Sequence, residues 1–590
     1  MKRLMSKTVY FSSLLSLVVL AGCAAGNVST QSGILAELNS LSTGSISTRV
    51  AVAEVDGKPA FLYSTKDGRV AFELGDKRQL LDETARVKDG GSFFQLKPLG
   101  DQLHATWWSH QDGKNIYITS SGDGGQRFTP VSMVNDSNGV LLPYSLVAGS
   151  GGVLGMAYHD ERLGGFQAYA NRSTDGGRTW ARPDTRLDEA QGNQTTNVFE
   201  PQMVQLGTSW ISTWTDVLRE SGPAVYRVMA RRTDDGGKSW LAPEVVYSAP
   251  SQISSLILRA DGNSIVAAAD QLGKGIVAFT SLDAGRTWRS TGLLPGTDKL
   301  SNSGIDLAVS GSRAHLVWME ERPGEKVRIM RASLDVSQAK WLVNAAQRLD
   351  VKQIESTKSL SPSLIATPQG AVLASWVDFR DIRPNIYLAA SYDQGQNWSL
   401  PQALLAPGEA SAGWPQLLPW RDQVAVGYEV YPADRIMDGK YVLRLLPAGE
   451  GARGLPGLPM PRQISEADRK AKLEQRIKTL WDNRVAGNYE PTYDMFDFAY
   501  KASTPKKSYV NSVGVITYLS YSTGEVAIKG NEADVAMKLR YEVQPTMMPS
   551  TGKMITLPAV DVESSNKWVW VGNDWYLVFS PSFEPPQLKY

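Results

Sequence analysis

The chain has 590 residues, of which 42% are hydrophobic and 21% are charged. Its 61 Lys and Arg residues are balanced by 60 Asp and Glu residues, so bulk charge gives it no attraction to nucleic acid. The length excludes one ordinary domain, and 53 glycines with 17 tryptophans favour many short strands and tight turns.

The first 23 residues have the pattern of a secretory signal. Lys2, Arg3 and Lys7 precede an apolar run over residues 8–20, which is too short to span a membrane. Leu-Ala-Gly-Cys at residues 20–23 resembles the bacterial lipobox, and Cys23 is the only cysteine of the chain. The resemblance implies lipidation of Cys23, and Ala24 after it favours the outer membrane. We therefore expect a lipid-anchored protein of the bacterial cell envelope without disulfides.

Residues 24–45 are small and polar, and they predict a flexible tether. Beyond them the phrase Ser/Thr-x-Asp-x-Gly-x-x-Trp/Phe recurs, and a degraded sixth copy has one inserted residue. The copies are Ser121–Phe128, Ser173–Trp180, Thr233–Trp240, Ser281–Trp288 and Ser391–Trp398, with Ser333–Trp341 as the degraded one. Their spacing of about 50 residues predicts a repeat architecture.

Each part of the phrase has a local role. Asp and Ser side chains bond backbone groups within a turn, glycine supplies a positive φ, and the aromatic residue packs back between neighbouring sheets. Two alternating strands precede each turn, as in Ala314–Met319 and Asn385–Ser391, and a shorter strand follows it. About four antiparallel strands per repeat predict the blade of a β-propeller.

The phrase resembles the Asp box, or bacterial neuraminidase repeat, of the sialidase superfamily. The resemblance covers residues 46–447 and implies a mainly β protein with a propeller of this kind. We expect seven blades, closed into a ring between the two ends of the domain. Six blades, the sialidase number, are the alternative.

Residues 448–463 are rich in Gly and Pro and predict a linker to a second domain at residues 464–590. Ser465 and Asp468 form a capping pair before a helix that stops at Gly487, and shorter helices are expected around residues 491–500 and 506–513. Strands then run to the end of the domain. This order of elements resembles the cone-shaped fold of nuclear transport factor two, a small α+β fold, which implies an apolar pocket and a binding or pairing role.

A second phrase recurs at the end of each blade's second strand, where an acid lies close to an arginine. Because the loops after strands two and three lie on opposite faces of a blade, we expect these residues around the mouth of the channel, opposite the boxes. They either pair within their own blade or form a ligand-binding ring. The residues are Asp160 and Arg162, Asp216 and Arg219, Glu320 and Arg322, and Asp378 and Arg380.

The sialidase resemblance implies an arginine triad that grips a sugar carboxylate, an aspartate acid/base and a tyrosine nucleophile activated by a glutamate. Glu200, Tyr428 and Tyr431 are the catalytic candidates. The Phe/Tyr-Arg-Ile-Pro phrase of sialidases is missing, and no acid/base aspartate stands out. We therefore expect a module that binds a glycan or an envelope protein, or acts as a scaffold. The alternative is an exo-acting glycoside hydrolase of sialidase type that cleaves terminal acidic sugars.

The sequence predicts no cofactor and no metal site. Its four histidines are scattered, and the boxes lack the alternating acids and closing glutamate of calcium loops. The expected partners are the lipid bilayer, through acyl chains on Cys23, and a glycan or an envelope protein.

Overall fold

The computed structural model describes most of the chain, in segments separated by short gaps. The described residues are 33–38, 50–65, 67–84, 87, 92–188, 197–219, 222–351, 357–381, 383–405, 410–421, 423–432, 439–446, 465–497, 500–501, 504–513, 516–530, 532–547, 554–571 and 574–578. The signal segment with Cys23 and the predicted linker at residues 448–463 lie outside them. No helix of the described part is long and apolar enough to cross a membrane.

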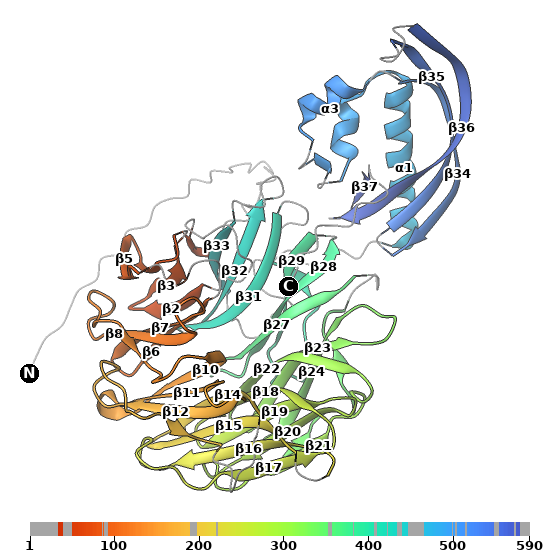
Figure 1. The fold of residues 1–590 in the computed structure, drawn as a ribbon. Helices are drawn as coiled ribbons and strands as arrows, with labels where there is room; N and C mark the ends of the chain where they lie inside the picture. The colour runs from red at the N-terminus through yellow and green to blue at the C-terminus, as the bar shows by residue number, and fades with distance from the viewer. Residues whose placement is uncertain are drawn as a thin grey trace, which may run out of the picture.

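Eight antiparallel sheets form a β-propeller in the described part of the chain up to residue 446 (Figure 1). We name these blades A to H, and each has four strands in a common order, with one additional short strand in blade G. Blade A contains β31 (Ala410–Trp420), β32 (Gln423–Pro432), β33 (Lys440–Leu446) and β1 (Ile34–Leu38). Blade B contains β2 (Ala51–Val55), β3 (Lys58–Ser64), β4 (Val70–Leu74) and β5 (Lys77–Asp82). Blade C contains β6 (Ser92–Leu99), β7 (Gln102–Ser109), β8 (Asn115–Ser121) and β9 (Ser132–Met133). Blade D contains β10 (Val140–Ala148), β11 (Leu154–Asp160), β12 (Gln167–Ser173) and β13 (Thr185–Arg186).

The other four blades follow the same order. Blade E contains β14 (Asn197–Leu206), β15 (Ser209–Leu218), β16 (Val225–Thr233) and β17 (Glu244–Ala249). Blade F contains β18 (Ile253–Asp261), β19 (Ser264–Gln271), β20 (Gly275–Ser281) and β21 (Arg289–Leu293). Blade G contains β22 (Ser301–Ser310), β23 (Arg313–Glu321), β24 (Arg328–Asp335) and β25 (Lys340–Trp341), with β26 (Gln347–Arg348) also paired to β24. Blade H contains β27 (Ser359–Ala366), β28 (Val372–Asp381), β29 (Arg383–Ser391) and β30 (Gln402–Ala403).

The propeller confirms the expected fold class, but the expected count of seven blades is wrong. Residues 51–82 build blade B without any box, and β1 completes blade A by pairing antiparallel with β33. Residues 34–38 therefore belong to the ring, which corrects the tether expected at residues 24–45. Lys440 also contacts Glu37 at 2.7 Å, although 403 positions separate them. The predicted closure between the two ends of the domain is confirmed.

The repeated boxes are closed turns. In the blade F copy, Ser281 Oγ donates to Asp283 Oδ1 at 2.8 Å and accepts the N–H of Gly285 at 2.9 Å. Asp283 Oδ1 also accepts the N–H groups of Arg286 and Thr287 at 3.1 and 2.9 Å. The same Ser/Thr–Asp–Gly contacts occur in the other four full copies. The predicted local role of the phrase is confirmed.

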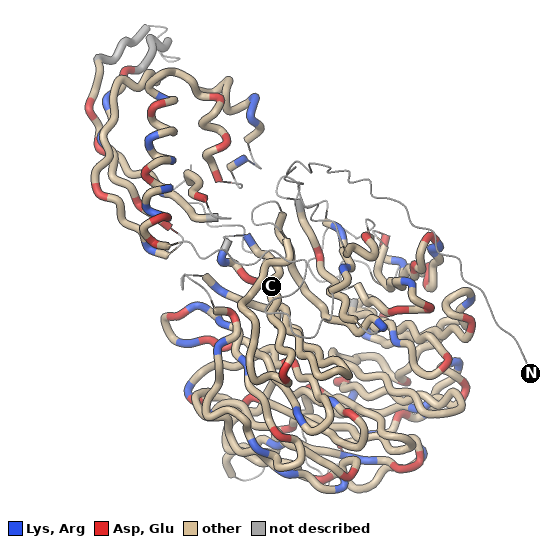
Figure 2. The backbone as a smooth tube through the Cα atoms, turned by 180° about the vertical axis from the view of Figure 1, so that it is seen from behind, with Lys and Arg blue, Asp and Glu red and all other residues tan. Residues whose placement is uncertain are grey.

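Box residues also join neighbouring blades. Trp180 of the blade D box packs with Trp108 and Ile118 of blade C. Gly395 has a φ of 81°, and a Cβ there would lie 2.6 Å from the His315 ring of blade G. This position therefore requires glycine for both its backbone conformation and its closeness to the next blade. Charges of both signs are interspersed over the blades (Figure 2).

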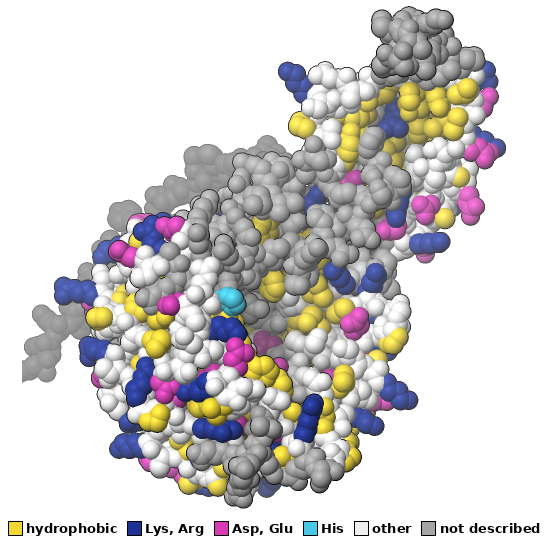
Figure 3. Space-filling model, viewed as in Figure 1, with side chains coloured by type: hydrophobic (Ala, Val, Ile, Leu, Met, Phe, Trp, Pro, Cys, Tyr) yellow, Lys and Arg dark blue, Asp and Glu magenta, His cyan; other side chains and the backbone are white. Residues whose placement is uncertain are grey.

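The C-terminal unit has its helices before its strands, as expected. They are α1 (Glu466–Val485), η3 (Glu490–Met495) and α3 (Lys506–Ser512), followed by an antiparallel sheet of β34 (Ile516–Lys529), β35 (Glu532–Met547), β36 (Met554–Val571) and β37 (Asp574–Val578). The Ser465 side chain caps α1 by accepting the Asp468 N–H at 3.1 Å. Leu473, Ile477, Leu480 and Trp481 of α1 are buried against the sheet. Hydrophobic side chains of this unit gather on the face seen in Figure 3.

The second predicted helix of this unit is shorter than expected. A 3-10 helix ends at Met495, because Phe496 is extended and bridges to Leu577 of β37. The Asp497 N–H then donates to the Leu577 carbonyl at 3.0 Å. Before α3, helical residues recur only at residues 500–501 of the described chain.

Candidate functional site

Strand register places the boxes and the acid–arginine phrases at opposite ends of each blade. In blade D, Leu154 at the start of β11 pairs with Ser173 of the box, whereas Asp160 at its end pairs with Gln167. Val140 at the start of the innermost strand β10 also pairs with Asp160. We call the end of the blades that carries the boxes the box face, and the opposite end, where the innermost strands begin, the mouth face.

Arg162 is held by three carboxylates at the mouth face. Its Nε donates to Asp160 at 2.7 Å and its Nη2 to Asp184 at 2.7 Å, and its Nη1 bonds Asp136. The guanidinium also lies 4.0 Å from the ring centre of Tyr169. Only 15% of the Arg162 side chain is exposed. The arginine therefore closes a network within blade D and the segment that enters it.

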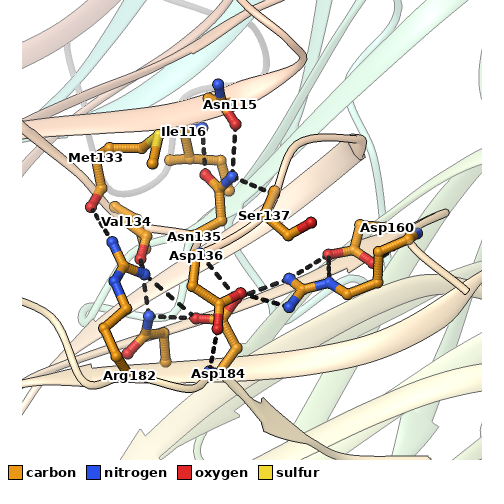
Figure 4. Close-up of polar contacts among 12 residues, drawn as sticks. Asn115, Ile116, Met133, Val134, Asn135, Asp136, Ser137, Asp160, Arg182 and Asp184 are labelled. Carbon is orange, nitrogen blue, oxygen red and sulfur yellow. Dashed lines mark hydrogen bonds and ion pairs between the residues drawn. The ribbon is translucent and has the colours of Figure 1, made fainter.

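Asp136 and Asp184 lie side by side in this network (Figure 4). The N–H of Asp136 donates to Asp184 Oδ2 at 3.0 Å, and the N–H of Asp184 donates to Asp136 Oδ2 at 2.8 Å. Burial raises the pKa of Asp184 to about 6. Burial also acts on Asp136, but hydrogen bonds from Asp184 and the charge of Arg162 outweigh it and lower the pKa of Asp136 to about 2. Of these two neighbouring carboxyl groups, that of Asp184 can therefore be protonated in mild acid, whereas that of Asp136 stays ionised.

Two other predicted pairs form inside their own blades. Arg322 Nε donates to Glu320 at 2.7 Å in blade G, and Arg380 Nη2 donates to Asp378 at 2.8 Å in blade H. Asp378 also accepts the indole N–H of Trp376 at 3.0 Å. These contacts agree with pairing within a blade, since the acid and the arginine satisfy each other.

Blade E departs from the expected pairing. Asp216 is bound by Arg227 of β16, through two hydrogen bonds of 2.8 Å each, and not by Arg219. Register explains the choice, because Asp216 faces Arg227 directly across the β15–β16 hairpin. Arg219 is exposed beyond the end of β15, and no described ion pair involves it. Burial raises the pKa of Asp216, and its bonds to Arg227 oppose that shift.

The three catalytic candidates lie in different surroundings. Glu200 of β14 accepts the N–H groups of Ser255 and Leu256 in blade F at 3.2 and 2.7 Å, and burial raises its pKa. Tyr428 is buried in the hydrophobic core of blades H and A. The Tyr431 hydroxyl donates to Glu429, a residue not expected from sequence, and burial followed by this carboxylate raises the tyrosine pKa. Glu200 is in blade E and the tyrosines are in blade A, so the structure does not bring them together.

A pocket of about 240 Å³ opens on the mouth face between blades D, E and F. It lies where β10, β14 and β18 begin and β11 and β15 end. Its lining consists of Leu142, His159, Phe199, Glu200, Thr215, Asp216, Val217, Tyr226, Gln252, Ile253 and Ser254.

The pocket combines an aromatic surface with polar groups. Phe199 is 41% exposed, and its ring lies edge-to-face against Phe166 at 5.6 Å between centres. Burial lowers the pKa of His159 to about 4, so the imidazole is neutral at pH 7. Its Nδ1 is buried and has no hydrogen-bond partner in the described part of the protein. Such a group is costly unless something else bonds to it.

Left-handed residues recur where the innermost strands reach the mouth face. Glu200, Ser255, Gly304, Ser361 and Trp414 have φ between 52° and 58°, and each strand shifts register there. Such bulges are common next to functional sites, and those in β14 and β18 lie beside the residues of these strands that line the pocket. Prolines within the strands could have predicted these bulges from the sequence, because prolines in strands are confined to edges and bulges. They are Pro201, Pro362 and Pro415.

A hollow of about 470 Å³ lies on the C-terminal sheet, among the ion pairs Lys538–Glu563 and Arg540–Asp561. All four of these side chains are more than half exposed. Surface ion pairs of this kind contribute little, and the hollow lacks the buried polar groups of the mouth-face pocket.

Comparison with protein families matches residues 146–342 to the BNR repeat-like domain. The comparison with curated proteins finds no match. Among solved structures, the GH93 α-L-arabinofuranosidase of Fusarium graminearum has a TM-score of 0.33 at 14% identity and covers 52% of this chain and 92% of its own. The NanB sialidase of Streptococcus pneumoniae has a TM-score of 0.31 at 10% identity, covering 70% and 92%. The PL25 ulvan lyase has a TM-score of 0.41 at 10% identity, covering 74% and 98%.

Such low identities and TM-scores give no basis for transferring an activity. The family match lies inside the repeat region predicted from the sequence and covers blades E and F entirely. Residues 146–342 are therefore similar to the BNR repeat-like domain, in agreement with the repeated phrase of the sequence.

Proposed function

We propose that the chain is a lipid-anchored protein of the bacterial cell envelope whose propeller binds a glycan in the mouth-face pocket. The observation that carries this proposal is that one pocket is lined by the exposed Phe199 ring and by His159, a residue whose Nδ1 has no partner in the described structure. A sugar ring offers an apolar C–H face and several hydroxyls. It therefore suits a site with an aromatic surface beside fixed hydrogen-bonding groups.

The pocket chemistry favours an uncharged sugar over an acidic one. Its described lining contains two carboxylates, those of Glu200 and Asp216, and no Lys or Arg. The arginines expected to grip a sugar carboxylate are bound by acids of their own blades in blades D, G and H. A carboxylate ligand would find no cation among the described lining residues, and burying an unpaired carboxylate costs binding free energy.

The lipid anchor rests on the sequence. The lipobox-like Leu-Ala-Gly-Cys and the charged, then apolar, segment before it support lipidation of Cys23. Ala24 supports sorting to the outer membrane. An anchored binding module of this kind holds a glycan, or a partner that carries one, at the membrane surface.

Hydrolysis of terminal acidic sugars is the second candidate, and the Tyr431–Glu429 hydrogen bond is the observation that favours it. A tyrosine beside a glutamate matches the nucleophile and base that the sialidase resemblance implies. Binding is the preferred role because Tyr431 lies in blade A, whereas the pocket with aromatic and polar groups lies between blades D, E and F.

The test is a glycan microarray probed with the labelled full chain carrying Cys23→Ser. We expect binding to neutral glycans that Phe199→Ala weakens at least about tenfold, since it removes an aromatic anchor. Leu342→Ala, which removes a side chain of 47% exposure on the box face, is the matched control and should bind normally. The proposed site would be refuted if Phe199→Ala bound glycans as well as the protein with Phe199, or if the protein with Phe199 bound no glycan. Release of a fluorophore from a sialoside that Tyr431→Phe abolishes would establish the hydrolase instead.

A further inference from the structure

We infer that the box face of the propeller lies against the bilayer and that the glycan pocket opens away from it. This inference rests on the lipid anchor at Cys23 proposed above. Three observations carry it: the place where the chain enters the ring, the length of chain before that place, and the exposed leucines of the box face.

The chain enters the propeller at the box face. β1 runs antiparallel to β33, and Ile34 pairs with Arg444 while Leu38 pairs with Tyr441. As the third strand of blade A, β33 ends at the box face, so Ile34 lies at the box-face end of β1 and Leu38 at the mouth-face end. The Gly33 carbonyl accepts the Leu445 N–H at 2.8 Å, which fixes the entry point one residue before the strand.

The chain between the anchor and this point is short. Residues 24–33 span at most about 35 Å when fully extended, at about 3.3–3.6 Å per residue. In the reverse orientation these residues would also have to run the height of the blade, which is about 23 Å for a strand of seven residues. Only about 12 Å of reach would remain, at a large cost in chain entropy. Entry at the box face removes that constraint.

The box face carries exposed leucines in four successive blades. They are Leu241 in blade E, Leu282 in F, Leu342 in G and Leu400 in H, and they are 56%, 44%, 47% and 46% exposed. Each lies within two residues of a box serine or tryptophan. Isolated exposed leucines are common, but these four lie in or just after the box turns of successive blades, and such a row on one face suits the boundary between headgroups and acyl chains. Together with the anchor on blade A, which follows H in the ring, they give support along five adjacent blades.

Charge on this face is balanced, so the bilayer need not be anionic. Exposed cations such as Arg178, Lys238 and Arg286 alternate with box aspartates whose oxygens are bonded within the turn. The apolar contact and the anchor therefore carry the orientation, and a zwitterionic surface is sufficient.

The described part of the C-terminal unit lies away from the box face. It lies beyond the adjoining ends of β28 and β29 (Figure 1), which are at the mouth face of blade H. The charge of Asp497 in this unit acts on Arg383 at the start of β29.

The test uses the lipidated full chain in phosphatidylcholine vesicles with nitroxide-labelled headgroups. Gln396→Cys on the box face and Leu163→Cys on the mouth face replace exposed side chains, and each carries one fluorophore because lipidation occupies the Cys23 thiol. We expect quenching at position 396 to exceed that at 163 at least about twofold, since headgroup contact is short-ranged. Leu241→Ser with Leu400→Ser should reduce this ratio, and Leu272→Ser, which replaces a mouth-face leucine of 51% exposure, should not.

The mass of the N-terminal peptide separates the two possible failures. An unmodified Cys23 would overturn the anchor and this orientation with it. A lipidated Cys23 with equal quenching at the two positions, or with stronger quenching at position 163, would overturn the orientation alone.

Discussion

At the box face, hydrogen-bond donors surround each box carboxylate, whereas at the mouth face burial outweighs the donors of Asp216 and Asp270. Hydrogen bonds from Thr287 and Ser281 lower the pKa of Asp283 to about 2, although burial opposes them. In the same blade F, burial raises the pKa of Asp270 to about 6, and the hydrogen bond that Asn302 donates to it at 3.0 Å opposes that shift. One side chain type thus has opposite shifts at two ends of one blade.

The two groups of carboxylates differ in how far along the chain their hydrogen-bond partners lie. A box carboxylate is satisfied by residues within four positions of it, so each blade repeats the turn on its own. Mouth-face acids depend on residues from other strands, as Asp216 depends on Arg227, or on other segments, as Asp184 depends on Asp136. We place the proposed function with the second group, because a mouth-face pocket there combines the unpartnered Nδ1 of His159 with the exposed Phe199 ring.

Arg162→Ala should have the largest effect. It leaves Asp136, Asp160 and Asp184 without their shared cation and should lower the free energy of unfolding by about 3–5 kcal/mol. Arg540→Ala, which breaks an ion pair with side chains 52% and 75% exposed, should cost less than about 1 kcal/mol. Urea denaturation measures both, and equal losses would contradict the buried network.

Gly395→Ala should cost about 3 kcal/mol, from a left-handed backbone and a contact with the His315 ring. Gly75→Ala, also left-handed but with nothing within 4 Å of the added Cβ, should cost about 1 kcal/mol. The two midpoints of denaturation give the comparison. A Gly395 variant as stable as the Gly75 variant would mean that the box does not fasten neighbouring blades.

Asp270 and Asp283 should contribute to the free energy of unfolding with opposite dependence on pH. The pKa of Asp270 is raised from 3.8, so its contribution to stability is full below pH 3.8 and is lost as the pH rises to about 6. The pKa of Asp283 is lowered, so its contribution is full above pH 3.8 and is lost as the pH falls to about 2. Relative to Asp270→Asn, the unmutated protein should lose about 2 kcal/mol between pH 4 and pH 6.

Relative to Asp283→Asn, the unmutated protein should lose stability only on acidification below pH 3.8. Unfolding free energies of the three proteins across pH 2–7 provide the measurement. Two profiles of the same sign would show that the faces do not differ in the way described.

His159→Leu should have the smallest effect on stability, below about 1 kcal/mol, because its buried Nδ1 has no partner in the described structure to lose. His315→Leu is the matched control, since the His315 Nδ1 bonds Ser333 Oγ at 2.9 Å, and it should cost about 1–3 kcal/mol. Glycan affinity should respond in the reverse order, with His159→Leu the more damaging. Loss of stability in both variants alike would indicate an unrecognised partner of His159.

The sequence predicted the features that are local. The box phrase predicts its own turn and the propeller, because its hydrogen bonds lie within four residues. The predicted number of blades was wrong because it depends on contacts between distant parts of the chain. Ile34–Leu38 forms a strand by pairing with β33, which lies more than 400 positions later. Ser465 predicted the start of α1 correctly, because its capping hydrogen bond to the Asp468 N–H is also local.

The candidate site was predictable only in part. The acid–arginine phrases pointed to the face that carries the candidate pocket, but hairpin register, and not sequence distance, determines the partner of Asp216. The pocket depends on Phe199, His159 and Ser254 from three blades, and no single segment of the sequence contains all of its lining residues. The proline after Glu200 marked the bulge that shapes it, although proline alone does not distinguish a bulge from a strand edge.

Hydrogen exchange with and without the glycan that binds most tightly in the array tests the mouth-face site most directly. We predict slower exchange in peptides covering residues 197–206 and 252–258, where β14 and β18 line the pocket, and unchanged exchange in the box peptides 173–180 and 281–288. Slower exchange confined to the box peptides, or equal in both sets, would contradict a glycan site on the mouth face.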